Sequence, residues 1–246
     1  MFPIRSAVPY RYAPVVTWAV IVANCVVFLA QTSLDPADLQ ALVYAFGLVP
    51  ARYLGLFSGG SGGPRLDDLL PFFTMMFLHG GWLHLIFNMW FLWLFGPAIE
   101  DRLGSGRYLV FYLFCGAVAS FAHILANPAS TEPAIGASGA IAGVLGCYMR
   151  LFPLARVVVV VPIIFIPLFF EIHAFVFVGF WFLVQVLQGT ASLALPAAGE
   201  SVAWWAHVGG FLAGFVLGPL LLRSERYYRP YYADEGVLGF DPMGRR

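Results

Sequence analysis

The sequence contains few charged residues. They make up 11% of the 246 residues, lysine does not occur, and hydrophobic residues make up 61%. A soluble domain carries roughly 25% charged residues, so this chain cannot cover a folded core with polar surface. The mean hydropathy of +0.83 agrees with this reading. The composition excludes a soluble globular protein and indicates an integral membrane protein.

Cysteine is also scarce. Cys25, Cys115 and Cys147 each fall in a different apolar segment, where a thiol behaves as a small hydrophobic group. We therefore expect neither a disulfide nor a thiolate site. No small-residue cleavage site follows the first apolar segment, so we expect a membrane anchor there and not a removable signal peptide.

Charge-free windows mark the membrane spans. A spanning helix needs about 20 residues, and six windows are long enough, which predicts spans at about 14–31, 71–96, 107–126, 135–151, 172–189 and 203–222. The remaining window, 157–170, is short and holds Pro162 and Pro167. Because proline interrupts a helix, we expect an interfacial or re-entrant connection there. The predicted fold class is an all-α integral membrane protein, a six-transmembrane-helix bundle over residues 1–223 with a long outer loop at 32–68 after the first helix.

The arginines predict the orientation of the bundle. With six spans both termini lie on one side, and all of the 13 arginines except Arg52 and Arg65 fall on that side. Basic residues are retained in the cytoplasm, so both termini are predicted to be cytoplasmic. Residues 224–246 are predicted to be a disordered cytoplasmic tail.

Polar side chains inside apolar spans are costly and are candidates for function. The second span holds His84 and Asn88, the fourth holds Ser138 and the sixth holds His207. Counted from the cytoplasmic charge that ends each span, at about 1.5 Å per residue, they lie roughly 18–24 Å from the cytoplasmic end. In a hydrocarbon core about 30 Å thick, all four lie in one layer of the outer half.

Glycines predict that two of these spans pack closely. Gly139 and Gly143 are four residues apart in the fourth span, and Gly210 and Gly214 share the face of His207 in the sixth. Small residues at this spacing let transmembrane backbones come into contact. Packing alone accounts for the glycines but not for a histidine on the same face, so we favour a functional role for His207.

Serine and histidine at one depth permit nucleophilic catalysis. A serine hydroxyl becomes a nucleophile when a neighbouring base takes its proton, and His207 is the candidate base for Ser138. The tetrahedral intermediate then needs hydrogen-bond donors aimed at its oxyanion. Asn88 and His84, one helical turn apart, are candidate side-chain donors. Ser138 lies near the start of its helix, where backbone N–H groups are unpaired.

Four motifs follow one another along the chain, and they carry a family resemblance. They are H-x-x-x-x-H-x-x-x-N at 79–88, E-D-R-L-G-S-G-R at 100–107, G-A-S-G at 136–139 and A-H-x-x-G at 206–210. In this order the chain resembles the rhomboid family of intramembrane serine proteases over roughly residues 10–222. The stretch F-G-L-V-P-A-R-Y at 46–53 is similar to the outer loop of that family.

The resemblance implies a role for each matched residue. Ser138 is the expected nucleophile and His207 the expected general base of a catalytic dyad without an acidic partner. His84, Asn88 and the backbone N–H of Ser138 are expected to form the oxyanion hole. The implied activity is that of a serine endopeptidase which cleaves membrane proteins in or near their transmembrane segments, and the expected location is the bacterial inner membrane.

The small residues before Ser138 suggest how a substrate approaches. Gly136 and Ala137 leave room for a substrate strand beside the nucleophile. The expected partners are membrane-protein substrates, single-span clients among them, and the lipid bilayer. No cofactor, metal or nucleic-acid partner is expected.

Two features depart from the family pattern. Some members carry an aromatic residue four positions after the serine, where its ring packs on the catalytic histidine, whereas this chain has Ala142. What orients His207 is therefore open, with Trp204 or Trp205 as candidates. The Trp-Arg pair found in the outer loop of some members is also absent from the sequence.

The remaining polar residues have structural interpretations. We expect His79 and His123 to be structural, and Glu171 and His173 to reach toward the cytoplasmic interface. A zinc site built from the histidines would need tetrahedral convergence and supporting carboxylates, and Glu132 is the only acid nearby, so we do not favour one. An inactive rhomboid-like protein that binds membrane clients should lack the serine or the histidine, and both are present. A small-solute transporter should show inverted repeats or charged midplane residues, and the sequence shows neither.

Overall fold

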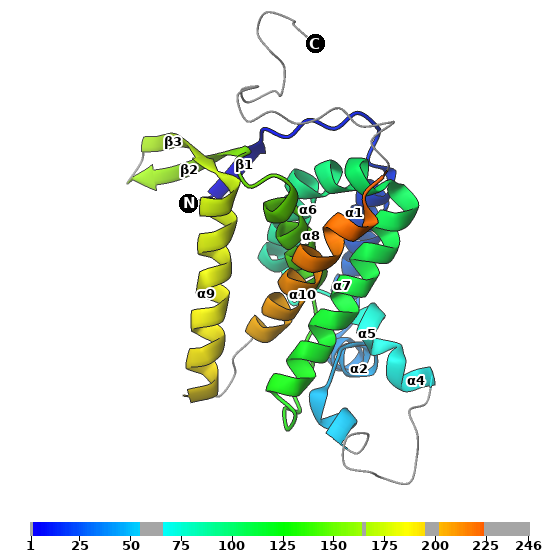
Figure 1. Cartoon of the computed structure of the whole chain (residues 1–246). Helices are drawn as coiled ribbons and strands as arrows, with labels where there is room; N and C mark the ends of the chain where they lie inside the picture. Colours follow the sequence, from blue (N-terminus) through cyan, green and yellow to red (C-terminus); the bar gives the residue numbers. More distant parts are fainter. Residues whose placement is uncertain (1, 55–65, 164–165, 195–201, 224–246) are drawn as a thin grey trace, which may run out of the picture.

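The computed structural model describes residues 2–54, 66–163, 166–194 and 202–223. The predicted tail at 224–246 lies outside the described residues. Within them the chain forms a bundle of long helices, with a small sheet at one end and short helices at the other (Figure 1).

Five described helices are long and apolar enough to cross a membrane. They are α1 (Val15–Thr32), α6 (Trp82–Leu103), α7 (Ser105–Ala126), α9 (Ala174–Ala194) and α10 (Trp204–Leu217), the last continued by the 3-10 helix η3 (Gly218–Leu221). A sixth helix, α8 (Ser138–Leu151), has only 14 residues and lies in the middle of the bundle (Figure 1). Residues 139–148 of α8 are all buried, so this helix faces other helices and needs less length than one facing lipid. The six-helix membrane bundle predicted from the sequence is confirmed.

Glycines bring α8 and α10 into backbone contact. A side chain added at Gly210 would collide with the carbonyl oxygen of Gly139, and one at Gly214 would collide with that of Gly143. Only a hydrogen atom fits at these two positions, which is how small residues allow membrane helices to approach. The contact holds the first turn of α8 beside the first turn of α10.

The second span begins later than the sequence indicated. The stretch expected to start it forms two short helices, α5 (Pro71–Thr74) and η2 (Met75–Phe77), and α6 starts only after Gly80 and Gly81. Glycine weakens a helix because it loses the most backbone freedom on folding. His79 therefore lies in the loop that precedes the span.

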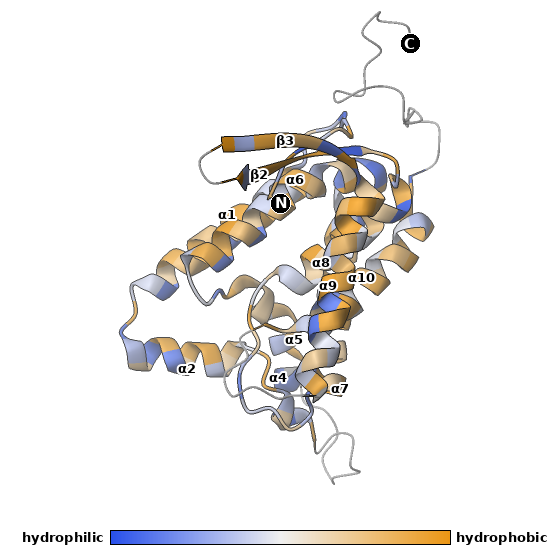
Figure 2. Ribbon diagram, turned by 90° about the vertical axis from the view of Figure 1, so that its left-hand side faces the viewer, coloured by the Kyte–Doolittle hydropathy of each residue, from blue (hydrophilic) through white to orange (hydrophobic). Residues whose placement is uncertain are grey.

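The long loop predicted after α1 is a layer of short helices. It contains α2 (Pro36–Phe46), η1 (Pro50–Tyr53) and α4 (Leu66–Leu69), and α2 runs across the end of α1 (Figure 2). The Tyr53 hydroxyl donates to the carbonyl oxygen of Asp68 at 2.9 Å, which ties η1 to α4. Burial, reinforced by the Asp68 carboxylate, raises the pKa of Tyr53 to about 12, so the phenol remains a donor at neutral pH.

A buried carboxylate joins α1 to the turn between α6 and α7. Glu100 accepts hydrogen bonds from the backbone N–H groups of Val16 and Thr17, from the Thr17 hydroxyl and from the Ser105 hydroxyl, at 2.7 to 2.9 Å. These backbone groups are the unpaired donors of the first turn of α1. The neighbouring Asp101 accepts from the amides just before α1. The E-D-R-L-G-S-G-R motif thus connects the start of α1 to the turn between α6 and α7.

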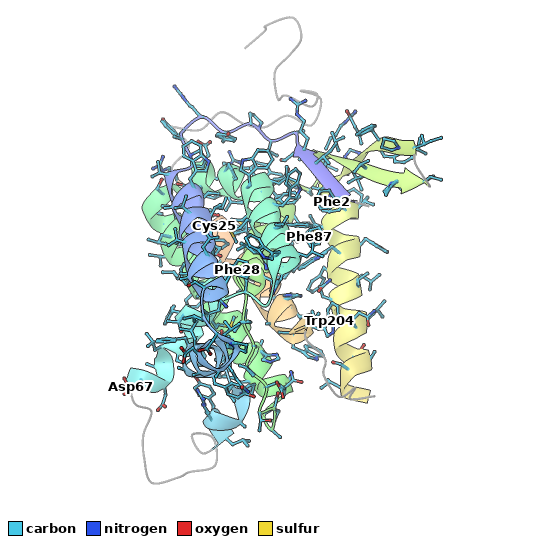
Figure 3. The ribbon with its side chains drawn as sticks, turned by 180° about the vertical axis from the view of Figure 1, so that it is seen from behind. Phe2, Cys25, Phe28, Asp67, Phe87 and Trp204 are labelled. Atoms are coloured by element: carbon cyan, nitrogen blue, oxygen red, sulfur yellow. The ribbon has the colours of Figure 1, made fainter. Side chains whose placement is uncertain are left out.

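A three-stranded sheet occupies the place of the expected re-entrant connection. The strands β2 (Arg156–Ile163) and β3 (Ile166–His173) form an antiparallel pair, and β1 (Phe2–Ser6) pairs antiparallel with the other edge of β2. The five valines at 157–161 favour a strand, because branched side chains fit a pleated surface. The ring of Phe2 lies 5.8 Å from that of Phe87, which seats β1 on α6 (Figure 3).

Glu171 and His173 were expected at the start of the fifth span, near the cytoplasmic interface. They belong instead to β3, and the helix begins at Ala174. Glu171 forms an ion pair with Arg156 at 2.9 Å, and the His173 Nδ1–H donates to the Leu154 carbonyl at 2.9 Å. Both contacts hold the hairpin that leads into α9.

Candidate active site

Ser138 and His207 meet at the start of their helices. Ser138 is the first residue of α8 and His207 lies in the first turn of α10. The Ser138 Oγ and the His207 Nε2 are 2.8 Å apart, within the range for a nucleophile and its base. His207 is buried, with 8% of its surface exposed, so its ring has little freedom to turn away from the serine.

Gln185 on α9 holds the other side of the His207 ring. Its Oε1 lies 2.8 Å from His207 Nδ1, and its Nε2 donates to the Trp181 carbonyl at 3.0 Å. A carbonyl oxygen only accepts hydrogen bonds, so the amide NH₂ must face Trp181 and Oε1 must face the histidine. His207 Nδ1 therefore carries the proton, and Nε2 is left bare to accept the proton of Ser138.

Aromatic side chains pack around His207 although Ala142 offers none. The Trp181 ring lies 5.8 Å from the His207 ring at 37°, and the Trp204 ring lies 6.3 Å away at 90°. Of the two candidates named from the sequence, Trp204 is the one whose ring packs on that of the histidine. The other candidate, Trp205, donates its indole N–H to the Gly189 carbonyl at 3.0 Å instead.

His84 lies beside Ser138, across Gly136. A side chain added at Gly136 would come within 2.8 Å of His84 Nε2 and 3.8 Å of Ser138 Oγ. The φ of Gly136 is 125°, a conformation that other residues rarely adopt. Glycine at this position therefore lets the backbone pass close to the His84 imidazole and to the Ser138 hydroxyl.

Asn88 and Ala137 are less directly placed. The Asn88 side chain is buried one turn below His84 and donates to the His84 carbonyl at 3.0 Å, so its amide is engaged within α6. Ala137 is fully buried at the start of α8. Of the two residues expected on the substrate path, Ala137 therefore belongs to the core, because the turn into α8 directs its methyl group inward.

The segment before Ser138 is hydrogen-bonded to the loop that follows α1. Leu48 and Ala134 exchange two backbone hydrogen bonds of 3.0 and 2.8 Å, and the Gly136 N–H donates to the Met75 carbonyl at 2.9 Å. These bonds fix the backbone on which the positive φ of Gly136 depends. The stretch at 46–53 thus supports the turn that presents the serine.

The other histidines have separate contacts. The backbone N–H and C=O of His79 both bond to the Gln31 side chain, at 3.0 and 3.2 Å, and its ring packs 5.1 Å from that of His84. His123 contacts Asn127 at 3.3 Å. Across the described ranges, no three His, Cys, Asp or Glu side chains converge as metal ligands would.

Comparison with known proteins gives a consistent family assignment. A rhomboid domain model matches residues 67–224. The chain is similar to mitochondrial rhomboid protein 1 of Saccharomyces cerevisiae, with 32% identity over 58% of this chain and 39% of the relative. It is similar to the rhomboid protease GluP of Bacillus subtilis, with 45% identity over 31% of this chain and 14% of the relative. It is also similar to RHOMBOID-like protein 5 of Arabidopsis thaliana, with 33% identity over 66% of this chain and 48% of the relative.

The matched region is less than half the length of each of these three relatives. The domain model, however, covers more than half of this chain and includes both the serine on α8 and the histidine on α10. Together with a membrane bundle of the expected helices, this match shows that the chain is a multi-pass membrane protein that belongs to the rhomboid family.

Proposed function

We propose that this protein is an intramembrane serine endopeptidase that hydrolyses peptide bonds in or near the transmembrane segments of other membrane proteins. The observation that carries the proposal is the 2.8 Å separation of Ser138 Oγ and His207 Nε2, on two helices locked together by glycines. The rhomboid protease among the relatives supports the same reaction class.

The geometry supports a two-stage acyl transfer. His207 Nε2 takes the proton of Ser138 as Oγ attacks the scissile carbonyl carbon, and the carbonyl oxygen becomes an oxyanion. The Ser138 backbone N–H at the positive end of α8 and the His84 imidazole are placed to donate to that oxyanion. His207 then protonates the leaving amine. A water molecule, deprotonated by His207, releases the acyl group and restores Ser138.

Gln185 supports this cycle without touching the substrate. By accepting the Nδ1 proton of His207 it fixes the tautomer in which Nε2 is a base. The residue that bonds to His207 Nδ1 is thus a neutral amide and not a carboxylate. The imidazolium formed during the reaction is therefore stabilised by a hydrogen bond without an opposite charge at that nitrogen. We infer a dyad with an amide as positioning residue.

The depth of the site defines the class of substrate. A helix cannot offer its carbonyl carbon to Ser138 because its backbone groups are paired and shielded, and each group freed in lipid costs several kcal/mol. Unwinding is easiest near the membrane boundary and next to Gly or Pro. The backbone at Gly136 and the imidazole of His84 both lie close to the serine, so little room is left beside it. We infer cleavage near the outer end of single-span proteins, after a small residue and close to a helix breaker.

The arginine distribution supports an orientation with both termini in the cytoplasm. On this topology Ser138 lies in the outer half of the bilayer, and the bacterial inner membrane is the inferred location. Clients are then single-span proteins of the same membrane.

The test is cleavage of a single-span reporter in proteoliposomes, with the products sized by mass spectrometry. The reporter carries Ala before a Gly-Pro pair near its outer end, and a matched reporter carries Leu in place of Ala. We expect cleavage after Ala by the wild type and none by Ser138→Ala. Cleavage confined to the cytoplasmic half, or equal cleavage after Leu, contradicts the substrate assignment. Binding of the reporter without cleavage by the wild type indicates an inactive family member.

A further inference from the structure

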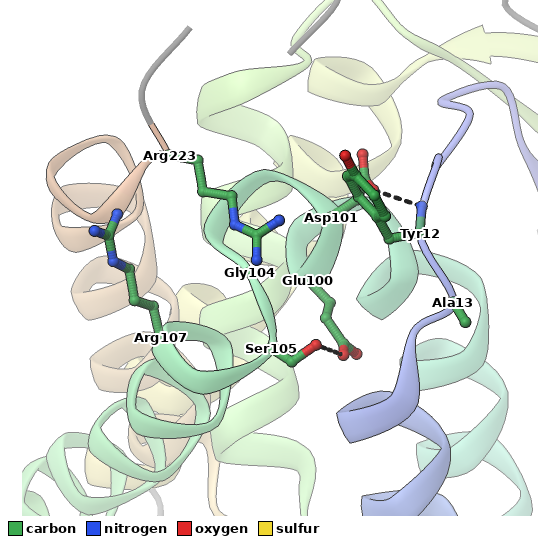
Figure 4. A pocket seen from close by; sticks show the side chains of 8 residues that line it. All are labelled: Tyr12, Ala13, Glu100, Asp101, Gly104, Ser105, Arg107 and Arg223. Atoms are coloured by element: carbon green, nitrogen blue, oxygen red, sulfur yellow. Dashed lines mark hydrogen bonds between the residues drawn. The ribbon is translucent and has the colours of Figure 1, made fainter. Parts of the chain in front are cut away.

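A polar pocket of about 670 Å³ lies at the end of α6 away from His84. Three parts of the chain line it: Tyr12 and Ala13 before α1, the turn from Glu100 to Arg107 between α6 and α7, and Arg223 after η3 (Figure 4). The proposed protease chemistry uses none of these residues. The pocket is nevertheless built from fixed groups, and their charges indicate a ligand.

Arg223 is held in the pocket by its backbone and by its side chain. Its N–H donates to the Arg102 carbonyl at 3.0 Å, and its Cζ lies 5.7 Å from the centre of the Tyr12 ring. Gly104, at a φ of 82°, packs against the guanidinium, and a side chain there would collide with it. The glycine thus leaves the space that Arg223 occupies.

A second guanidinium faces the same pocket. Arg107 uses its Nη1 to donate to the carbonyls of Leu221 and Leu222, at 3.3 and 3.0 Å. An arginine has five N–H donors, so donors on its other nitrogens are left for a ligand. Within the described ranges neither Arg107 nor Arg223 forms an ion pair with a carboxylate. Two positive charges therefore border the pocket without a described acidic partner.

The two carboxylates of the pocket are not equivalent. Glu100 is saturated by its hydrogen bonds to α1 and Ser105. Asp101 accepts the N–H groups of Arg11 and Tyr12 with Oδ1 alone, at 3.0 and 2.9 Å. Its Oδ2 has no hydrogen bond within the described part of the chain. The pocket thus offers cationic donors on one side and one available carboxylate oxygen on the other.

We propose that this pocket binds a phosphoethanolamine headgroup. The phosphate accepts hydrogen bonds from Arg223 and Arg107, since guanidinium groups match phosphate oxygens in geometry and charge. The ammonium lies against Asp101 Oδ2. A headgroup with phosphate alone would leave this carboxylate facing like charge, and a trimethylated ammonium would have no N–H to donate to it.

The location of the pocket favours a phospholipid as the source of the headgroup. It lies at the arginine-rich end of the spans, where basic pockets between membrane helices bind lipid headgroups. Exposed apolar side chains occur within three positions of its lining residues in the sequence: Val15 near Ala13 is 59% exposed, Val110 near Arg107 is 66% exposed and Leu220 near Arg223 is 74% exposed. These side chains offer the acyl chains a surface that a soluble phosphoethanolamine would not use.

Native mass spectrometry of the full chain in detergent tests the proposal. The protein is titrated separately with phosphatidylethanolamine, phosphatidylcholine, phosphatidylglycerol and soluble phosphoethanolamine. We expect phosphatidylethanolamine to be retained best. Arg223→Gln should lower its affinity about tenfold, which corresponds to about 1.4 kcal/mol. The matched control is Arg150→Gln, because Arg150 also packs on an aromatic ring, that of Phe215 at 5.7 Å, but does not line the pocket. This control should bind as the wild type does.

A second variant tests the headgroup assignment separately. Asp101→Asn keeps an oxygen for the two amides before α1 and removes the negative charge, so it should abolish the preference for phosphatidylethanolamine over phosphatidylglycerol. Equal binding by Arg223→Gln and Arg150→Gln overturns the site. A wild-type preference for phosphatidylglycerol overturns the ethanolamine assignment, and equal binding of soluble phosphoethanolamine overturns the lipid source.

Discussion

Replacement of Gln185 tests how His207, the proposed general base, is oriented. Gln185→Leu keeps the approximate size of the side chain but removes the oxygen that lies 2.8 Å from His207 Nδ1. Both residues are buried, so water does not readily replace the lost acceptor. The variant leaves a buried N–H donor unpaired and removes the preference for the tautomer with a bare Nε2.

The size of the effect follows from the cost of that unpaired donor. A buried donor without a partner costs about 1–3 kcal/mol, and each 1.36 kcal/mol added to the barrier slows the reaction tenfold. We therefore expect kcat to fall about 5- to 150-fold. KM should change little, because Gln185 bonds to His207 and not to Ser138. Gln185→Glu, which keeps an acceptor oxygen, should retain more activity than Gln185→Leu.

The assay is steady-state cleavage of the reporter in proteoliposomes over a range of reporter concentrations, with thermal unfolding in detergent measured in parallel. Gln188→Leu is the matched control, since Gln188 is an exposed residue of the same helix. The control should cleave at the wild-type rate. If Gln185→Leu and Gln188→Leu cleave equally fast, or if Gln185→Leu raises KM and leaves kcat unchanged, Gln185 does not orient His207.

Three further substitutions test other contacts. Glu100→Ala removes a buried acceptor whose hydrogen bonds contribute about 1.5–3 kcal/mol each. It should lower the unfolding midpoint in detergent far more than Glu132→Ala, which changes an exposed site. Equal midpoints contradict a stabilising role of Glu100 at the start of α1. Gly214→Ala places a methyl group against a carbonyl of α8 and should lower both midpoint and activity, whereas Gly106→Ala, which meets open space, should leave the midpoint near that of the wild type. Asn88→Ala should slow single-turnover cleavage without abolishing it, since one oxyanion donor contributes about 10²–10³ in rate; a wild-type rate removes Asn88 from the oxyanion hole.

The helical bundle was predictable because charge and apolar length are direct consequences of the lipid environment. Charge-free windows located the spans without any contact information. The start of α6 was placed too early, since Pro71–Phe77 is as apolar as the span itself and only the glycines before Trp82 mark the break. The sheet was missed for a different reason. Pro162 and Pro167 argued against a helix, but the pairing of 157–161 with the chain's first residues is a long-range contact that local patterns do not reveal.

The site was predictable where depth and spacing coincide. Counting residues from the cytoplasmic charges placed Ser138 and His207 in one layer, and the glycine spacing put their helices together. Gln185 was missed because it is a neutral residue of a mainly apolar helix and belongs to none of the four motifs. A depth count would have found it as a polar residue of the fifth span. That Gln185 and not Gln188 faces the histidine depends on the rotation of α9, which only the packed structure defines.

The most direct test of the proposed function is labelling with a serine-directed fluorophosphonate, followed by peptide mapping. The reagent bonds to a serine hydroxyl only when a neighbouring base activates it. We predict that the wild-type protein in detergent is labelled at Ser138, that Ser138→Ala is not labelled, and that His207→Ala loses the label while it remains folded. Labelling at another serine, or undiminished labelling of Ser138 in His207→Ala, would contradict the assignment of these two residues as nucleophile and base.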